Sequence, residues 1–180
     1  SDCRRLLTAD IRDQLQRVYG LQPDGTALPT GNLQHLDEHG LEIARELRIW
    51  QDHLVTTEHG ADQKRRIAAF DRLAQETAFT ALNRLGALRL CEERGHILEC
   101  VRRGKESDGF ALYERLSGGA LGTRGDTYRQ FLQRVFDELA QDLGVLFDRR
   151  QPQSLVFPGE RCLEEVLTLM NDPALRHLWQ

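Results

Sequence analysis

The sequence contains very little lysine and no long apolar segment. Lys64 and Lys105 are the only lysines among 24 basic residues, so the other 22 are arginines. No apolar run approaches the ~18 residues that a membrane-spanning helix needs, and the N-terminus lacks the apolar core of an export signal. We therefore expect a cytoplasmic protein that does not enter a membrane. The net charge of −4 also argues against a dedicated nucleic-acid-binding domain, which is usually strongly basic.

Cysteines are few and widely spaced, at positions 3, 91, 100 and 162. A chain of 180 residues can bury a sufficient core without covalent cross-links. We therefore expect free thiols rather than disulfides.

Alternation of apolar and polar residues, the pattern of a half-buried strand, is almost absent. Apolar residues instead return every three or four positions, which is typical of amphipathic helices. The sequence predicts an all-α fold, an irregular multi-helix bundle around one long central helix at about 62–94. At most a very short extended segment is expected, near 155–157. The other predicted elements are helices near 7–18, 37–57 (with Asp37 as N-cap), 97–103, 108–116, 128–147 and 163–170, and a terminal turn at 175–179.

The central helix is predicted to end at Gly95 and to carry many small residues on its apolar face. Small residues let neighbouring helices approach closely. Gly86 is expected to serve this purpose, because a glycine inside a helix costs ~1 kcal/mol relative to alanine and should have a packing reason.

The end of the sequence continues an amphipathic pattern without a cap or a polar tail. Met170, Leu175 and Trp179 belong to this apolar stripe. The pattern predicts an exposed apolar face that needs a partner. We therefore expect residues 1–180 to be a single helical domain and an N-terminal fragment of a larger protein.

Two residue patterns fit metal-binding motifs only in part. His35, Glu38 and His39 match H-x-x-E-H, in which two histidines one helical turn apart hold zinc. The segment follows a Pro/Gly turn, so a solvated helix start is expected instead. Cys91, His96 and Cys100 straddle Gly95 and lack the C-x-x-C spacing of structural zinc sites, so buried thiols are expected there. No metal ligand is predicted.

Basic residues form four local clusters that are candidates for contact with DNA phosphates. If they share a face, they would neutralise several phosphates and add sequence-independent affinity. The alternative is ordinary solvated surface paired with nearby carboxylates. The candidate residues are Lys64, Arg65, Arg66, Arg102, Arg103, Lys105, Arg124, Arg149 and Arg150.

The run FDRLAQETAFTALNRLGALRLCEERG, from Phe70 to Gly95, resembles a known family. Its strongest part is the A-F-T-x-L-N-R-L core from Ala78 to Leu85. The chain resembles the N-terminal helical region of adenine-specific DNA methyltransferases of BREX-type phage-defence and restriction-modification systems. Weaker similarity extends over the rest of the chain.

The resemblance implies a parent protein that transfers a methyl group from S-adenosylmethionine to the N6 nitrogen of a flipped-out adenine. The adenine-pocket and cofactor-loop motifs of that catalytic domain are absent from this sequence. The fragment is therefore expected to need no cofactor, to catalyse nothing by itself, and to support a C-terminal methyltransferase domain. The implied partners are that domain, DNA through the parent protein, and other phage-defence proteins.

Asn83 and Arg84 lie within the resembling core, and the resemblance assigns them no catalytic role. A polar pair inside an apolar helix is expected to satisfy neighbouring backbone groups or a carboxylate such as Glu76. Two other functions remain open from the sequence: a free-standing helical adaptor that binds protein through its C-terminal stripe, and a zinc hydrolase.

Overall fold

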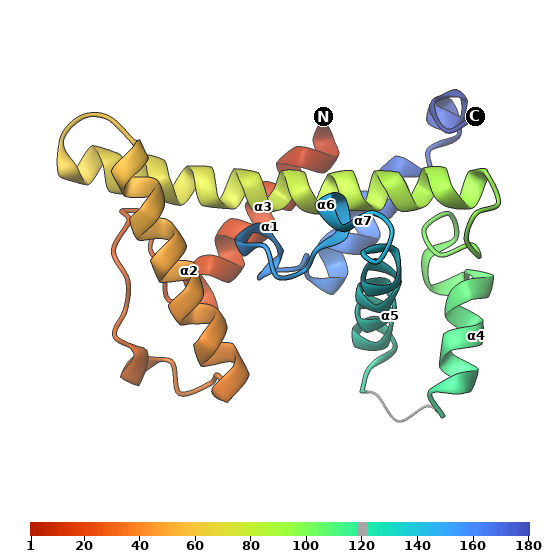
Figure 1. Ribbon diagram of the computed structural model, residues 1–180, viewed down its shortest axis with the longest axis horizontal. Helices are drawn as coiled ribbons and strands as arrows, with labels where there is room; N and C mark the ends of the chain where they lie inside the picture. The colour runs from red at the N-terminus through yellow and green to blue at the C-terminus, as the bar shows by residue number, and fades with distance from the viewer. Residues whose placement is uncertain (119–121) are drawn as a thin grey trace.

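The computed structural model describes residues 1–118 and 122–180 and has the predicted all-α fold. Figure 1 shows one long helix with the remaining helices packed along it. The elements in chain order are α1 (Asp2–Arg17), η1 (Thr30–Asn32), α2 (Glu38–Thr57), α3 (Asp62–Glu93), η2 (Gly104–Glu106), α4 (Asp108–Leu116), α5 (Arg124–Leu139), α6 (Gly144–Phe147), η3 (Pro152–Ser154), α7 (Glu160–Met170) and η4 (Pro173–Leu178), where η denotes a 3-10 helix.

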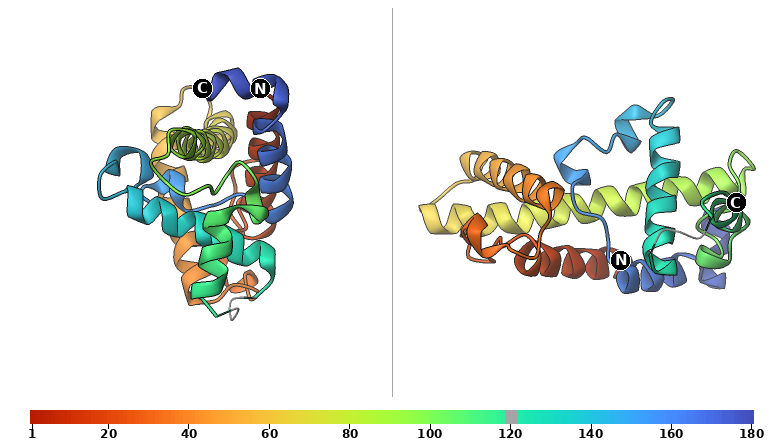
Figure 2. Two further views of the ribbon diagram at one scale, coloured as in Figure 1. Left: turned by 90° about the vertical axis from the view of Figure 1, so that its right-hand side faces the viewer. Right: turned by 90° about the horizontal axis from the view of Figure 1, so that it is seen from below.

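The predicted central helix is confirmed as α3, whose 32 residues span about 48 Å. Its buried face carries small side chains, so the neighbouring helices can lie close to its axis. Figure 2 shows α1 and α7 along one side of α3 and α2 and α6 along the other, while α4 and α5 cross beneath its C-terminal half. The small residues buried on α3 are Ala69, Ala74, Ala78 and Ala81.

One continuous apolar cluster joins these helices. Leu7, Ile11 and Leu15 of α1 are fully buried in it, as the spacing predicted. Helix α1 begins at Asp2, earlier than the apolar stripe indicated. A helix begins before its first buried residue, so the stripe alone places the start too late.

The loop between α1 and α2 approaches α3 most closely at Gly25. Gly25 has φ of +82°, a conformation that side chains with a Cβ rarely adopt. A Cβ at this position would lie 2.4 Å from the Cβ of Arg66 on α3. The carbonyl of Gly25 accepts a 2.9 Å hydrogen bond from buried Gln51 of α2. Glycine therefore lets the loop lie against two helices at once.

The single helix predicted over 128–147 is wrong, because the chain breaks after α5 and restarts as α6. The apolar spacing continues through the break, which misled the prediction. The break turns the chain back, so that the rings of Phe136 and Phe147 meet at 5.6 Å. Leu143 is 48% exposed at the break.

One smaller prediction also fails, and the limit of at most a very short extended segment near 155–157 is confirmed. Residues 97–103 contain no helix. The first helical turn after α3 is η2, which begins at Gly104. Residues 155–157 form no strand pairing, and the isolated bridge that occurs in the described part of the chain joins Leu21 to Ala27. Arg84 explains part of the missing strand pairing at 155–157, because its hydrogen bond to Ser154 holds the preceding turn against α3.

None of the helices in residues 1–118 and 122–180 has the length and apolar character to cross a membrane.

All four thiols are free, as predicted. Burial raises the pKa of Cys162 from 9.0 to about 12 and raises that of Cys100 further. In the native protein at about pH 8 we expect Ellman's reagent to modify Cys91 first and to leave these two thiols unmodified, because only the thiolate reacts. In guanidinium all four should react. Fast modification of Cys100 in the native state would contradict the buried placement.

The same shift has a consequence for stability. A thiol whose pKa is raised by folding stabilises the protein fully below its unfolded pKa. That contribution should fall as the pH rises from 9.0 towards about 12.

Candidate functional site

Most of the predicted DNA-contacting residues are paired with carboxylates. At the start of α3, Arg65 and Arg66 both bind Asp62, at 3.2 and 2.8 Å. Arg103 binds Glu99 and Asp108 at 2.7 and 2.8 Å. These partners lie within five residues of each arginine, so the pairs are local features of the helix ends.

Other predicted residues are paired over longer distances in the sequence. Lys105 lies between Glu160, at 2.6 Å, and Glu164 of α7. Arg124 binds Glu106 at 2.8 Å and Glu114 at 3.3 Å.

The last cluster, Arg149 and Arg150, is also paired. Arg149 binds Asp137 at 2.7 Å and Arg150 binds Asp148 at 3.0 Å. Lys64 and Arg102 are exposed and have no ion pair within the described part of the chain. The sequence left open whether these residues contact DNA phosphates or pair with nearby carboxylates. Seven of the nine candidates pair with carboxylates.

This pairing predicts a weak salt dependence of DNA binding. Neutralising nine phosphates would give a slope of log K against log salt of about −8, whereas two free cations give about −2. We expect fluorescence anisotropy of a labelled duplex, measured over a series of salt concentrations, to show a slope near −2. A slope near −8 would mean that the ion pairs open to bind DNA.

Arg84 and Asn83 have different environments although they are neighbours on α3. Arg84 is only 4% exposed and donates to the carbonyls of Leu146 and Asp148 at 2.7 and 2.9 Å. The prediction that it satisfies backbone groups is confirmed. Glu76 is not its partner, because Glu76 binds Arg72. Asn83 is exposed, so the expected buried role is wrong for it.

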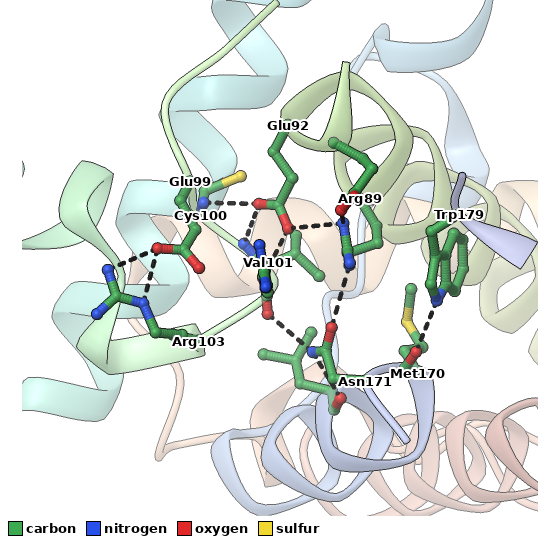
Figure 3. A network of polar contacts seen from close by, with 12 residues as sticks. Arg89, Glu92, Glu99, Cys100, Val101, Arg103, Met170, Asn171 and Trp179 are labelled. Atoms are coloured by element: carbon green, nitrogen blue, oxygen red, sulfur yellow. Dashed lines mark hydrogen bonds and ion pairs between the residues drawn. The ribbon is translucent and has the colours of Figure 1, made fainter. Parts of the chain in front are cut away.

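The C-terminal end of α3 is held by a buried carboxylate, drawn in Figure 3. Glu92 accepts 2.8 Å hydrogen bonds from the backbone N–H groups of Cys100, Val101 and Arg102. Arg89 lies 3.5 Å from the same carboxylate. The chain reverses between these partners at Gly95, whose φ is +73°. Glu92 thereby fixes the segment that follows α3.

The same network reaches the end of the chain. Arg89 donates to the amide oxygen of Asn171 at 3.1 Å and lies over the ring of Trp179. The indole N–H of Trp179 donates to the carbonyl of Met170 at 3.0 Å. Met170 is buried and Trp179 and Leu175 are half-buried. The predicted open C-terminal stripe is therefore partly covered, because Met170 is buried and Trp179 lies against Arg89 at the end of α3. Leu178, in contrast, is 57% exposed.

An apolar groove lies between α4, α5 and residues 96–98, which follow the end of α3. Its volume is about 480 Å³. Leu98, Leu112 and Leu116 line it and are exposed, with Leu116 79% exposed. Arg134 and Glu138 of α5 also line the groove.

Two packing contacts shape this groove, one at Gly109 and one between two aromatic rings. The N–H of Gly109 donates to the carbonyl of Glu99 at 2.9 Å, and a Cβ on Gly109 would lie 2.6 Å from that oxygen. The start of α4 is thus pressed against the preceding segment. The rings of Tyr113 and Phe131 meet at 5.4 Å and join α4 to α5. The groove is therefore formed by fixed elements.

Sequence reasoning missed the groove leucines. The residues 108–116 were predicted only as a short helix, although Leu112 and Leu116 lie one turn apart on it. That spacing is the sequence signal for an apolar stripe on this helix. It does not show whether the stripe is covered, because the covering elements lie elsewhere in the sequence.

The partial metal motifs do not form sites. His35 lies in a turn before α2, with its Nε2 atom 2.7 Å from the carbonyl of Val18. Asp37 caps α2 as predicted, accepting from the N–H of Gly40. His35 and His39 are therefore not one turn apart in one helix. No cluster of three or more His, Cys, Asp or Glu residues suited to a metal ion occurs in the described ranges.

Comparisons of the chain with protein-family models, with curated proteins and with solved structures gave no match. The functional interpretation therefore depends on the residues and geometry of this chain.

Proposed function

We propose that the chain is a non-catalytic helical docking module of an adenine-specific DNA methyltransferase in a phage-defence or restriction-modification system. Its parent would use S-adenosylmethionine to methylate the N6 nitrogen of adenine. The module supports the catalytic domain, and in the cell it works in the cytoplasm. The methyltransferase part of the proposal is supported by the resemblance of residues 70–95.

The docking part is supported by one observation, the open apolar groove beside α4 and α5. Three leucines remain exposed in it, and scattered single leucines are common on protein surfaces whereas a lined groove is not. A helix from a partner places apolar side chains into such a groove at intervals of three or four residues. The catalytic domain of the parent protein is the proposed occupant.

The rigid support of the groove favours the same interpretation. One wall, residues 96–98, lies between the end of α3 and the backbone at 100–102 that Glu92 holds, and the aromatic pair of Tyr113 and Phe131 joins α4 to α5. A preformed surface loses little conformational entropy when a partner binds. In this proposal contact with DNA is secondary and falls to the two unpaired residues among the nine candidates, Lys64 and Arg102.

The complete product of the reading frame that encodes residues 1–180 tests the methyltransferase assignment. Purified protein is incubated with radiolabelled S-adenosylmethionine and duplex DNA, and labelled N6-methyladenine is measured. We expect transfer by the complete product and none by residues 1–180 alone. A complete product that methylates no adenine in DNA containing many different sequences would refute the assignment.

The groove is tested in the same protein. Changing Leu98, Leu112 and Leu116 together to glutamine should weaken the attachment of the module, measured as faster proteolysis between module and catalytic domain. Ile49→Gln is the matched control, because Ile49 is exposed on α2, away from the groove. Equal proteolysis of the triple variant and the control would show that the groove does not dock the catalytic domain.

A free-standing adaptor is the second candidate, and the groove also supports it. In that case the groove binds a separate protein, such as another phage-defence component. The complete reading frame distinguishes the two, because an adaptor gene encodes no methyltransferase activity.

A further inference from the structure

The side of α3 that the other helices leave uncovered carries an unusual glycine. Gly86 lies within the last third of α3, and nothing comes within 4 Å of a Cβ built on it. The expectation that Gly86 lets helices of the same chain pack closely is therefore wrong. A glycine inside a helix costs ~1 kcal/mol relative to alanine. Packing within one chain does not account for that cost.

Gly86 shares its face with an exposed aromatic ring. Residues three or four apart lie on the same side of a helix, and Phe79 and Asn83 precede Gly86 at these spacings. Phe79 is 52% exposed and Asn83 is also exposed. Leu90 follows and is half-buried. This outer face of α3 is uncharged in its middle and open to a close neighbour at Gly86.

The outer face of α3 matches the same face of a second copy when the two helices run antiparallel. In order it carries an acid, an aromatic ring, a small polar residue, a glycine, an apolar residue and a base: Glu76, Phe79, Asn83, Gly86, Leu90 and Arg94. An antiparallel copy centred between Asn83 and Gly86 places each glycine opposite the asparagine of the other copy. Phe79 then lies opposite Leu90 of the second copy.

The charges at the two ends fit the same arrangement. Glu76 has a side chain that is 33% exposed and binds Arg72 at 2.8 Å. Arg94 is exposed and has no ion pair within the described residues. In the antiparallel arrangement Glu93, which binds Arg89 of its own chain, stands opposite Glu76 of the other copy, and Arg94 lies one position further along. Because a twofold interface repeats every contact, the attraction between Arg94 and Glu76 occurs twice.

We propose that α3 mediates an antiparallel homodimer, with Gly86 at the point where the two helices cross. A second copy is the proposed occupant because two identical outer faces match each other when the two α3 helices run antiparallel. The contact involves one helix from each chain and is small, so the dimer should be weak, with Kd on the order of 10 to 100 μM. This inference does not depend on the proposed methyltransferase function.

Sedimentation velocity of residues 1–180 tests the dimer. Over concentrations from about 5 to 500 μM, we expect the protein to shift from monomer to dimer. Gly86→Gln should abolish the shift by blocking close approach, while its thermal stability stays equal or rises because glutamine favours helix. Ile49→Gln, on α2, should dimerise like the wild type. A wild type that stays monomeric throughout, or a Gly86→Gln variant that still dimerises, would refute the proposal.

Charge reversal tests the antiparallel register. Glu76→Arg and Arg94→Glu should each weaken the dimer by about tenfold, because two ion pairs become repulsive. The double variant Glu76→Arg/Arg94→Glu should recover dimerisation, since the opposite charges face each other again. Single variants that dimerise normally, or a double variant that does not recover, would contradict this register.

Discussion

Replacing Glu92 with alanine is expected to lower the free energy of unfolding by about 4 kcal/mol. The substitution removes the acceptor for three backbone N–H groups, at Cys100, Val101 and Arg102. It also leaves Arg89 without one of its carboxylate partners. Buried donors without an acceptor are costly, which is why the expected loss exceeds that of a surface ion pair. Chemical denaturation followed by far-UV circular dichroism measures it.

Two variants separate this effect from the loss of a charge. Glu92→Gln keeps the volume and one acceptor oxygen, so an intermediate loss is expected. Glu99→Ala removes the partly exposed partner of Arg103 in the segment after α3 and should cost less than about 1 kcal/mol. If Glu92→Ala cost no more than Glu99→Ala, the carboxylate would not hold the segment after α3.

Replacing Arg84 with methionine is expected to cost about 3 kcal/mol. Methionine keeps the apolar part of the side chain and removes the guanidinium. The carbonyls of Leu146 and Asp148 and the hydroxyl of Ser154 then lose a donor. The segment between α6 and α7 is held to α3 by these bonds, so it should also exchange its amide hydrogens faster.

Asn83→Ala is the matched control for Arg84. It changes the adjacent polar residue of the same motif, but Asn83 is exposed and we expect a change within about 0.5 kcal/mol. Equal losses in the two variants would contradict the different environments of these neighbours. A normal amide exchange rate in 146–154 of the Arg84 variant would contradict its anchoring role.

Local signals in the sequence were sufficient to predict α3. Its apolar spacing and the glycine at position 95 are properties of adjacent residues, and the observed helix ends at Glu93, one residue before the predicted end. The end of α5 was not predictable in the same way. The apolar spacing continues past Leu139, but the chain breaks there and Phe147 packs back onto Phe136. That contact depends on the tertiary structure.

The charged residues show the same limit more clearly. The basic clusters were found from sequence, but their partners were not, because Lys105 pairs with residues 55 and 59 positions away. The role of Glu92 was also missed, since its three donors come together only after the chain reverses at Gly95. Gly86 was correctly seen as unusual. Its explanation within one chain was wrong, because the sequence does not indicate which side of a helix is covered.

We propose that the groove beside α4 and α5 docks a larger neighbour. Hydrogen–deuterium exchange compares the amides of residues 96–98, 109–116 and 131–139 in residues 1–180 alone and in the complete gene product. We predict slower exchange of these amides in the complete product, while the buried turns of α3 exchange equally in both. Identical exchange at the groove in the two proteins would contradict the claim.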